Sequence, residues 1–364
     1  MLVDTFKISF LQVQIHKINK HFLYIRFMIL VTGGTGLVGS HLLYQLTLEN
    51  EFVKAIYRKN SNLNAVKNVF SYFTEDYEVL FSKIIWIEAD ITDIVSLGYA
   101  SENVSIVYHS AALVSFNSKD YKAMRKINIE GTSNIVNTCI EKKIKKLCFV
   151  SSIATIEKAI GQKIIDENCE WNTEKNNYGY AITKYGAEME VWRASQEGVP
   201  VVIVNPGVIL GAGFWKNGTG ALFSKIDKGM PFYTEGITGF VSVHDVVKIM
   251  IKLMDSELKN ERYILVAENV SFKEVFYKIA QYLGKKPPTV KVTKLMGEIV
   301  WRIEKVKSIF SAKPPILTKH SAKSIHNKHF YSSEKIKKEL SFEFEPISET
   351  IKKVCDLYTN KTTF

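Results

Sequence analysis

The chain has 364 residues, of which 46% are hydrophobic, and its formal net charge is +11. This length accommodates one large α/β domain with a smaller region beside it, and the composition is that of a globular protein rather than a disordered one. No run approaches the roughly 18–20 uninterrupted apolar residues of a membrane-spanning helix, so we expect a soluble, cytoplasmic protein. The four cysteines form no Cys-x-x-Cys pair, which predicts reduced thiols and no metal site.

Residues 1–27 differ from the rest of the chain. They mix basic and aromatic residues and contain no compact apolar run followed by a small-residue cleavage site, so a signal peptide is not expected. Met28 directly precedes the first apolar run. We therefore predict that Met28 is the biological start and that residues 1–27 are an extension outside the fold. A membrane-touching amphipathic segment is the alternative.

From residue 28 onward, short β-branched runs alternate with longer helical periods. Strands that are apolar throughout and are separated by amphipathic helices predict a doubly wound parallel sheet, a Rossmann domain over residues 28–205. In this architecture the ligand binds beyond the carboxyl ends of the strands. The predicted strands span residues 28–32, 52–58, 84–88, 105–109, 146–151 and 201–205, and the predicted helices span 37–49, 121–141 and 178–197.

Residues 206–364 are assigned mainly to substrate binding. A glycine-rich loop over 206–220 precedes a predicted strand near 240–243, which we expect to return to the Rossmann sheet. Asp245 is expected to cap the helix that follows, because its carboxylate can accept from free first-turn N–H groups. Further helices are predicted near residues 272–283 and 291–310, with a last one ending near Tyr358.

A glycine motif follows the first predicted strand. Gly33, Gly36 and Gly39 stand three apart where a helix opens, which permits a tight turn, close approach of the backbone to a pyrophosphate and close helix–strand packing. The helix N-terminus adds free N–H groups and the positive end of its dipole. The motif predicts dinucleotide binding, with Thr35, Leu37 and Val38 as further contacts.

The end of the second predicted strand bears on the choice of dinucleotide. NAD-preferring proteins usually carry an acid there for the ribose 2′-hydroxyl, whereas this chain has Tyr57 and then Arg58. A guanidinium can pair bidentately with a 2′-phosphate. We therefore predict NADP(H), with NAD(H) as the alternative if Arg58 is only a solvated surface residue.

A candidate catalytic set lies farther along the chain. Tyr180 and Lys184 are four apart, on one helical face, and a nearby ammonium lowers the pKa of a phenol. Ser152 follows the strand over 146–151, at the carboxyl end where a substrate should lie. Tyr180 is predicted to be the acid–base group, Ser152 to hold the substrate oxygen, and Lys184 to tune the tyrosine.

With these motifs the chain resembles the extended short-chain dehydrogenase/reductases, the NAD-dependent epimerase/dehydratase superfamily, from Met28 to near the C-terminus. Phe149-Val150-Ser151-Ser152 is similar to the serine strand of that family and makes Ser152 the catalytic serine. The resemblance also implies that Tyr180 and Lys184 contact the cofactor. The remaining cofactor contacts that it implies are Asp90 and Ile91 at the adenine, Ser110, Ala111 and Ala112 along the dinucleotide, Asn128 on the next helix, and Pro206 and Val208 at the nicotinamide.

The resemblance also bears on the reaction. The chain is more similar to dihydroflavonol reductases than to sugar-nucleotide dehydratases, whose acids after the serine strand are replaced here by Ile153 and Ala154. We therefore expect reversible reduction of a ketone or aldehyde, with a hydrophobic carbonyl or alcohol as the substrate. The alternatives are a sugar-nucleotide epimerase and a non-catalytic NADP(H) sensor. The family resemblance further implies a possible homodimer.

A basic segment lies near the C-terminus. Residues 285–328 hold eleven Lys or Arg against two Glu, an excess of nine. This local concentration of charge argues against a nucleic-acid partner. Within it, an apolar set recurs at helical spacing with Lys and Arg on the other side: Leu295, Met296, Ile299, Val300, Ile303, Val306 and Phe310. We predict that this amphipathic helix covers the substrate pocket; docking on an anionic membrane surface is the alternative.

Overall fold

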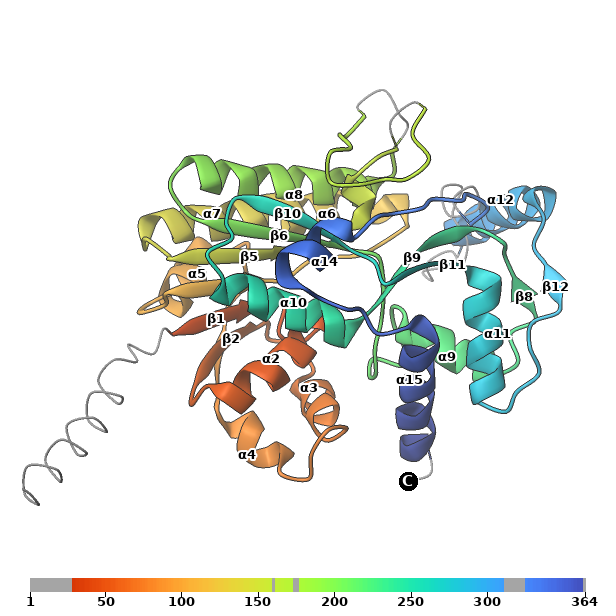
Figure 1. Cartoon of the computed structure of the whole chain (residues 1–364), viewed down its shortest axis with the longest axis horizontal. Helices are drawn as coiled ribbons and strands as arrows, with labels where there is room; N and C mark the ends of the chain where they lie inside the picture. The colour runs from red at the N-terminus through yellow and green to blue at the C-terminus, as the bar shows by residue number, and fades with distance from the viewer. Residues whose placement is uncertain (1–27, 159–160, 173–176, 311–324, 363–364) are drawn as a thin grey trace, which may run out of the picture.

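The computed structural model describes residues 28–158, 161–172, 177–310 and 325–362. The extension over residues 1–27 lies outside the described residues. A seven-stranded parallel sheet forms the centre of the molecule, with the order β10-β6-β5-β4-β1-β2-β3 (Figure 1). The strands are β1 (Ile29–Thr32), β2 (Val53–Tyr57), β3 (Ile84–Glu88), β4 (Ile106–His109), β5 (Lys146–Val150), β6 (Val201–Pro206) and β10 (Glu261–Leu265).

Helices cover both faces of this sheet, as the doubly wound prediction requires (Figure 1). Each face has its own hydrophobic core, because side chains alternate between the two sides of every strand. On one face lie α2 (Leu37–Glu49), α3 (Leu63–Phe70), α4 (Tyr77–Ser82) and α10 (Val243–Asp255). On the other lie α5 (Ile94–Ala100), α7 (Gly131–Glu141) and α8 (Gly179–Gln196).

The helix predicted over residues 121–141 contains an irregularity. It begins as α6 (Tyr121–Met124), widens to a π-helical stretch over Arg125–Glu130, and continues as α7. Such π-helical turns are rare and often occur at functional sites. Here the turn places Asn128 inside the protein, where its side chain is buried.

The smaller region has its own sheets. β7 (Val208–Leu210), β9 (Ile237–Ser242) and β11 (Glu268–Ser271) form one, and β8 (Phe232–Tyr233) and β12 (Val290–Lys291) form another. β6 continues into β7, β9 leads through α10 back to β10, and β10 continues into β11, so the chain passes between the large sheet and the three-stranded sheet three times. Its helices are α9 (Gly220–Asp227), α11 (Phe272–Tyr282), α12 (Lys294–Phe310) and α15 (Ile347–Thr362). α14 (Glu334–Leu340) instead packs on the large sheet beside β10.

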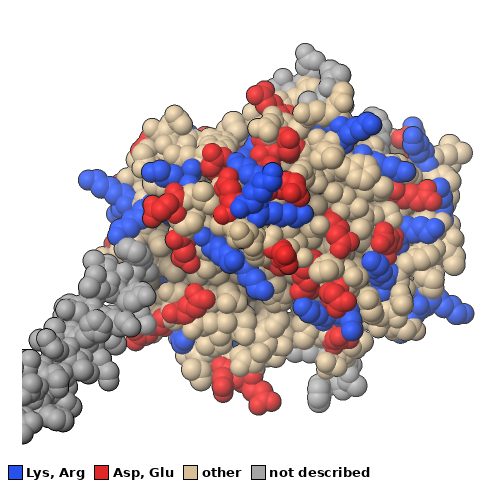
Figure 2. Space-filling view, in the orientation of Figure 1, with Lys and Arg blue, Asp and Glu red and all other residues tan. Residues whose placement is uncertain are grey.

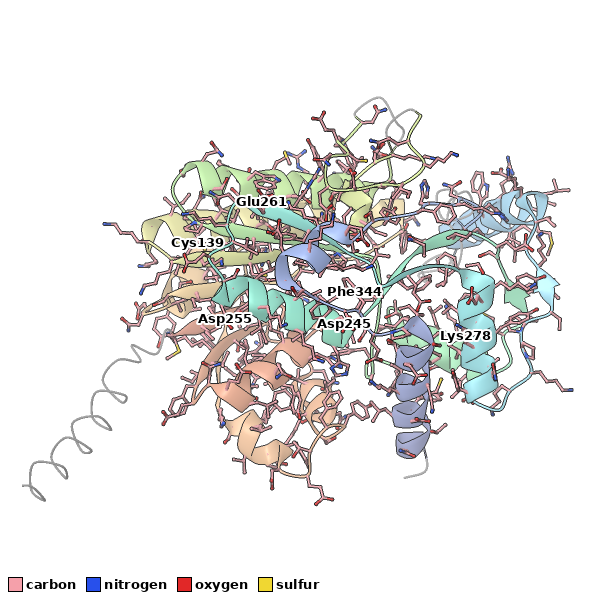
Figure 3. All side chains as sticks on the ribbon, in the orientation of Figure 1. Cys139, Asp245, Asp255, Glu261, Lys278 and Phe344 are labelled. Atoms are coloured by element: carbon pink, nitrogen blue, oxygen red, sulfur yellow. The ribbon has the colours of Figure 1, made fainter. Side chains whose placement is uncertain are left out.

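Two expectations for this region are wrong. The strand near 240–243 does not return to the Rossmann sheet: β9 pairs with β7 and β11, and the returning strand is β10, which pairs with β6. Asp245 does not cap α10, because the helix begins earlier and its cap is Ser242, whose hydroxyl accepts from the His244 N–H. The Asp245 carboxylate instead accepts from the Glu345 N–H at 2.9 Å, next to Phe344 (Figure 3).

In the part of the chain that the structure describes, no helix is long and apolar enough to cross a membrane. Acidic and basic side chains are interspersed over the face seen in Figure 2, without one continuous patch of either sign.

Candidate active site

The glycine motif forms the turn between β1 and α2. Gly33 has a φ of +71°, and a Cβ there would lie 2.5 Å from the Ala111 nitrogen. A Cβ on Gly39 would lie 2.2 Å from the Gly33 oxygen. These two positions therefore exclude any side chain, because such contacts are far inside van der Waals distance. Gly36 precedes α2 with no side chain to cap the helix, so the first N–H groups of α2, at Leu37 and Val38, stay available to an anion.

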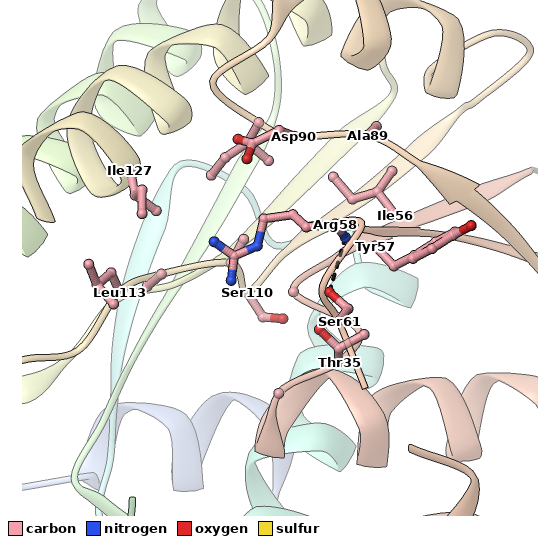
Figure 4. Close-up of a pocket in the computed structure, with 15 residues that line it drawn as sticks. Thr35, Ile56, Tyr57, Arg58, Ser61, Ala89, Asp90, Ser110, Leu113 and Ile127 are labelled. Atoms are coloured by element: carbon pink, nitrogen blue, oxygen red, sulfur yellow. Dashed lines mark hydrogen bonds between the residues drawn. The ribbon is translucent and has the colours of Figure 1, made fainter. Parts of the chain in front are cut away.

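A cavity of about 240 Å³ opens in front of this turn, at the carboxyl ends of β1, β2 and β4 (Figure 4). Nine of the predicted cofactor residues line it: Gly33, Thr35, Gly36, Arg58, Asp90, Ile91, Ser110, Ala111 and Ala112. The cavity walls also include six residues that were not predicted as cofactor contacts: Ile56, Tyr57, Ser61, Ala89, Leu113 and Ile127. The end of β2 was a usable signal for Ile56 and Tyr57, but no local pattern marked Ser61 or Ile127.

Arg58 extends into this cavity (Figure 4). Its backbone N–H donates to the Ser61 hydroxyl at 3.0 Å, which fixes the loop after β2. Among the residues that the structure describes, no acid forms an ion pair with the Arg58 guanidinium. The guanidinium is therefore available to a ligand phosphate.

Asn128 connects the cavity to the helix that carries Tyr180. Its amide oxygen accepts from the Leu113 N–H at 2.8 Å, and its amide nitrogen donates to the Leu113 oxygen and to the Thr183 hydroxyl, each at 3.0 Å. The two bonds to Leu113 hold the loop after β4, and the bond to Thr183 reaches α8, so Asn128 links the loop to this helix. The structure thus gives Asn128 a positioning role behind the cavity rather than a place in its wall.

Pro206 and Val208 lie at the passage from β6 to β7, on either side of Gly207. They do not line the cavity described above. A Cβ on Gly207 would lie 2.4 Å from the Gly239 oxygen, so the strands approach each other too closely there for any side chain.

Ser152, Tyr180 and Lys184 meet where β5 ends. Tyr180 and Lys184 lie on the same face of α8, and the Lys184 ammonium donates to the Val150 carbonyl at 2.7 Å. The Ser152 hydroxyl hydrogen-bonds to the Tyr180 phenol and also accepts from the Ala154 N–H at 3.1 Å. The structure therefore brings together all three residues that the sequence predicted.

Burial dominates the electrostatics of this group. It raises the pKa of Tyr180 to about 12, and the Ser152 hydroxyl acts in the opposite direction. The Lys184 ammonium is bound to the Val150 carbonyl and lies over the Phe149 ring, 4.2 Å from the ring centre; the effect of Lys184 on the pKa of the tyrosine stays a prediction. Burial lowers the pKa of Lys184 to about 7, against an opposing effect of the Glu188 carboxylate.

Glu188 is the residue that the sequence reasoning missed. Its side chain is fully buried one turn after Lys184, and one carboxylate oxygen accepts from the hydroxyls of Ser151, at 2.5 Å, and Thr155, at 2.8 Å. The same oxygen accepts from the Asn205 amide at 2.9 Å. The other oxygen accepts from the Arg262 guanidinium at 3.3 Å.

Three consecutive residues of the β5 end are thus held by one face of α8. Lys184 binds the oxygen of Val150, and Glu188 binds the hydroxyl of Ser151. Tyr180 binds the hydroxyl of the next residue, Ser152. Because positions i, i+4 and i+8 share one helix face, this arrangement fixes the register between α8 and the serine strand.

His109, on β4, lies beside this group but cannot exchange protons with a ligand. Its two ring nitrogens hydrogen-bond to the hydroxyls of Thr32, at 2.6 Å, and Thr132, at 2.9 Å. The ring is fully buried, and burial lowers its pKa to about 3. It therefore stays neutral and forms part of the wall behind the site.

Comparison with known proteins bears on this site directly. A family model described as "Male sterility protein" matches residues 31–257, which include the glycine turn and the Ser152/Tyr180/Lys184 group. The chain belongs to this family of extended short-chain dehydrogenase/reductases. It is accordingly an NAD(P)-binding enzyme of the oxidoreductase and epimerase superfamily.

The relatives of this extended short-chain dehydrogenase/reductase include both reductases and epimerases, according to their names. A dihydroflavonol 4-reductase of Dianthus caryophyllus is 26% identical, over 72% of this chain and 74% of its own. A UDP-glucose 4-epimerase of Vibrio cholerae is also 26% identical, over 74% of this chain and 81% of its own. Among solved structures, gox2253 is 25% identical with a TM-score of 0.75, over 92% of this chain and 98% of its own.

Proposed function

We propose that the protein reduces a ketone or aldehyde with NADP(H), and that the reaction runs in reverse as alcohol oxidation. The observation that carries the proposal is the contact between Ser152, which follows β5, and Tyr180 of α8. The same helix carries Lys184, which binds the end of β5. Bound NADPH would supply the hydride from a site formed by the glycine turn, Arg58 and the cavity of Figure 4.

In this proposal Tyr180 is the proton donor. A phenol whose pKa lies near 12 keeps its proton at neutral pH, so it is suited to protonate an alkoxide that develops as the carbonyl is reduced. The Ser152 hydroxyl holds the substrate oxygen beside the phenol. Lys184, whose pKa burial lowers to about 7, is protonated in about half of the molecules at neutral pH and would contact the nicotinamide ribose.

The preference for NADP(H) rests on Arg58. Its guanidinium lies in the cavity, β2 ends in Tyr57 instead of an acid, and no described acid pairs with the guanidinium. A 2′-phosphate would gain a charge-assisted, bidentate partner there, whereas the 2′-hydroxyl of NAD(H) would gain no carboxylate acceptor from this strand.

A hydrophobic carbonyl or alcohol is the substrate class that we propose, because of the aromatic surroundings of Tyr180. The Tyr178 ring lies 6.0 Å from the Tyr180 ring, and Phe116 stacks on Tyr178 at 5.7 Å with 14° between the ring planes. Phe116 and Val114 of the same loop are exposed. An apolar substrate would cover this surface.

The direct test combines mass spectrometry of the copurified nucleotide with turnover on a panel of carbonyls under NADPH and NADH. Tyr180→Phe should lower turnover by roughly 10²–10⁴-fold while NADPH affinity stays within about twofold, since the phenol is needed for proton transfer. Retained turnover in this variant contradicts the proposal.

Two other outcomes would replace the proposed carbonyl reduction by a different function. A UDP-sugar interconverted with no net NADPH consumption, by protein that retains its nucleotide through purification, would establish an epimerase, the reaction named for the Vibrio cholerae relative. Tight NADPH binding with no oxidation across the panel would favour a cofactor sensor. A homodimer, expected from family resemblance, is tested by the mass of the protein in solution.

A further inference from the structure

Helix α12 lies in the smaller region, beside β12 and away from the parallel sheet (Figure 1). An ordinary surface helix turns its apolar stripe toward the core and its polar side toward water. α12 does the opposite over its described side chains. Gly297 is buried and Trp301 is partly buried, whereas the exposed fractions are 71% for Leu295, 50% for Ile299 and 49% for Ile303.

The three exposed residues stand four apart and form one stripe along successive turns of the helix. Val300, at the edge of the stripe, is also exposed, by 41%. Two further apolar side chains are exposed on the strand pair beside this helix, Val290 of β12, which precedes α12, and its neighbour Phe232 of β8. A stripe of this kind is costly to leave in water, so its exposure indicates an external partner.

The charge around the stripe indicates what that partner is. From Lys285 to Ile303 the chain carries five Lys or Arg and a single acid, Glu298. Three of the cations form ion pairs: Arg302 with Glu298, Lys285 with Asp227 and Lys291 with Glu235. With these three acids counted, an excess of two positive charges is left, at Lys286 and Lys294. An apolar stripe with cationic residues on and beside its helix matches an interfacial helix, which inserts side chains at the acyl boundary while Lys and Arg contact anionic headgroups.

Two other occupants fit less well. A second copy of the chain would bring two segments of the same positive charge together, which is unfavourable. Closure over the substrate, the lid that the sequence analysis favoured, would require α12 to turn by about half a rotation, because Gly297 and Trp301 lie opposite the stripe on a 3.6-residue helix.

We propose that the exposed stripe of α12, formed by Leu295, Ile299, Val300 and Ile303, docks the protein on an anionic lipid surface. This surface is separate from the residues assigned to chemistry and cofactor binding. It would place the smaller region, and with it the substrate side of the enzyme, against the membrane.

The test is co-sedimentation of the full chain with vesicles of phosphatidylcholine, with and without phosphatidylglycerol. The protein should sediment with the anionic vesicles only. Leu295→Glu/Ile299→Glu should weaken this binding at least roughly tenfold, because the variant puts carboxylates into both the apolar and the anionic part of the contact. Val79→Glu is the matched control, since Val79 is 61% exposed on α4 and lies outside the stripe; its binding should be unchanged.

Thermal unfolding and NADPH binding should be the same for all three proteins, which separates loss of docking from loss of fold. No sedimentation with anionic vesicles overturns the proposal, and so does equal sedimentation with neutral ones. A fall in solution mass in the Leu295→Glu/Ile299→Glu variant would also overturn it, by assigning the stripe to a dimer interface. A changed KM without vesicle binding would assign it to a lid.

Discussion

Replacing Glu188 by Gln tests the arrangement that holds the catalytic group. The substitution keeps the shape of the side chain and removes its charge. Glu188 receives four hydrogen bonds, from Ser151, Thr155, Asn205 and Arg262. A hydrogen bond to a charged group contributes about 1.5–3 kcal/mol to stability, and one between neutral groups about 0.5–1.5 kcal/mol. Each of the four bonds should therefore contribute roughly 1 kcal/mol less in the Gln variant.

The expected loss of stability is therefore about 3–4 kcal/mol, close to the 3–5 kcal/mol typical of breaking a buried ion pair. For a chain of this size that corresponds to a melting temperature roughly 4–5 °C lower. Glu190→Gln is the matched control, because Glu190 lies on the same helix and pairs with Arg193 at 2.9 Å near the surface. A half-exposed pair of this kind contributes at most about 1 kcal/mol.

The same substitution should change the pH dependence of catalysis. The Glu188 carboxylate raises the pKa of Lys184 against the effect of burial. Without it the pKa of Lys184 falls below about 7, so the ammonium is lost at neutral pH. As the pH is raised, turnover of the reduction should therefore begin to decline at a lower pH in the variant than in the natural protein.

The two assays are thermal unfolding and the pH profile of turnover, the latter supported by NMR titration of isotope-labelled lysine, with Lys184→Met to assign the signal. Lower stability with an unchanged lysine titration would leave Glu188 a purely structural residue. An unchanged melting temperature and an unchanged profile together would refute the reasoning.

Three further changes have defined outcomes. Arg58→Ala should weaken NADPH binding roughly 10–100-fold and leave NADH binding unchanged, whereas equal weakening of both in a fluorescence titration would remove the basis for NADP(H) preference. Gly39→Ala should abolish dinucleotide binding, because its Cβ would meet the Gly33 oxygen at 2.2 Å, while Gly98→Ala, where nothing lies within 4 Å, should be tolerated in the same assay. Burial lowers the pKa of His41 from its ordinary value of 6.5 to about 3. Between these two pH values the histidine is protonated in the unfolded chain but neutral in the folded one. The free energy of unfolding should therefore fall by up to roughly 1.4 kcal/mol for each pH unit of acidification in this range. His41→Gln should flatten this decline in acid-dependent unfolding, and an unchanged slope would contradict it.

Local patterns predicted the features that depend on local sequence. The glycine turn, the parallel strands through β6 and the Ser152/Tyr180/Lys184 group each follow from short motifs with a definite spacing. The partner strands of β9 and of β10 could not be predicted in this way. Both strands are short, and contacts with residues distant in the sequence decide which strand each one pairs with.

Glu188 illustrates the same limit. An acid in the middle of a helix resembles a solvated surface residue, and its partners come from β6, β10 and the segment after β5. Only the assembled fold shows that the acid is buried. At α12 the sequence predicted burial and the structure shows exposure. The periodic apolar residues predicted a face that covers the substrate pocket, but Leu295, Ile299 and Ile303 are exposed.

The two direct passages from the large sheet to the three-stranded sheet, at β6–β7 and at β10–β11, are hydrogen-bonded. Gly207 alone separates β6 from β7, and its N–H donates to the Leu265 oxygen at 3.0 Å. Beside it, the Ala267 N–H between β10 and β11 donates to the Phe240 oxygen at 2.8 Å. The return of the chain from β9 through α10 to β10 adds a third connection between the two sheets. Because these connections act together, we expect the smaller region to keep a fixed position relative to the cofactor cavity.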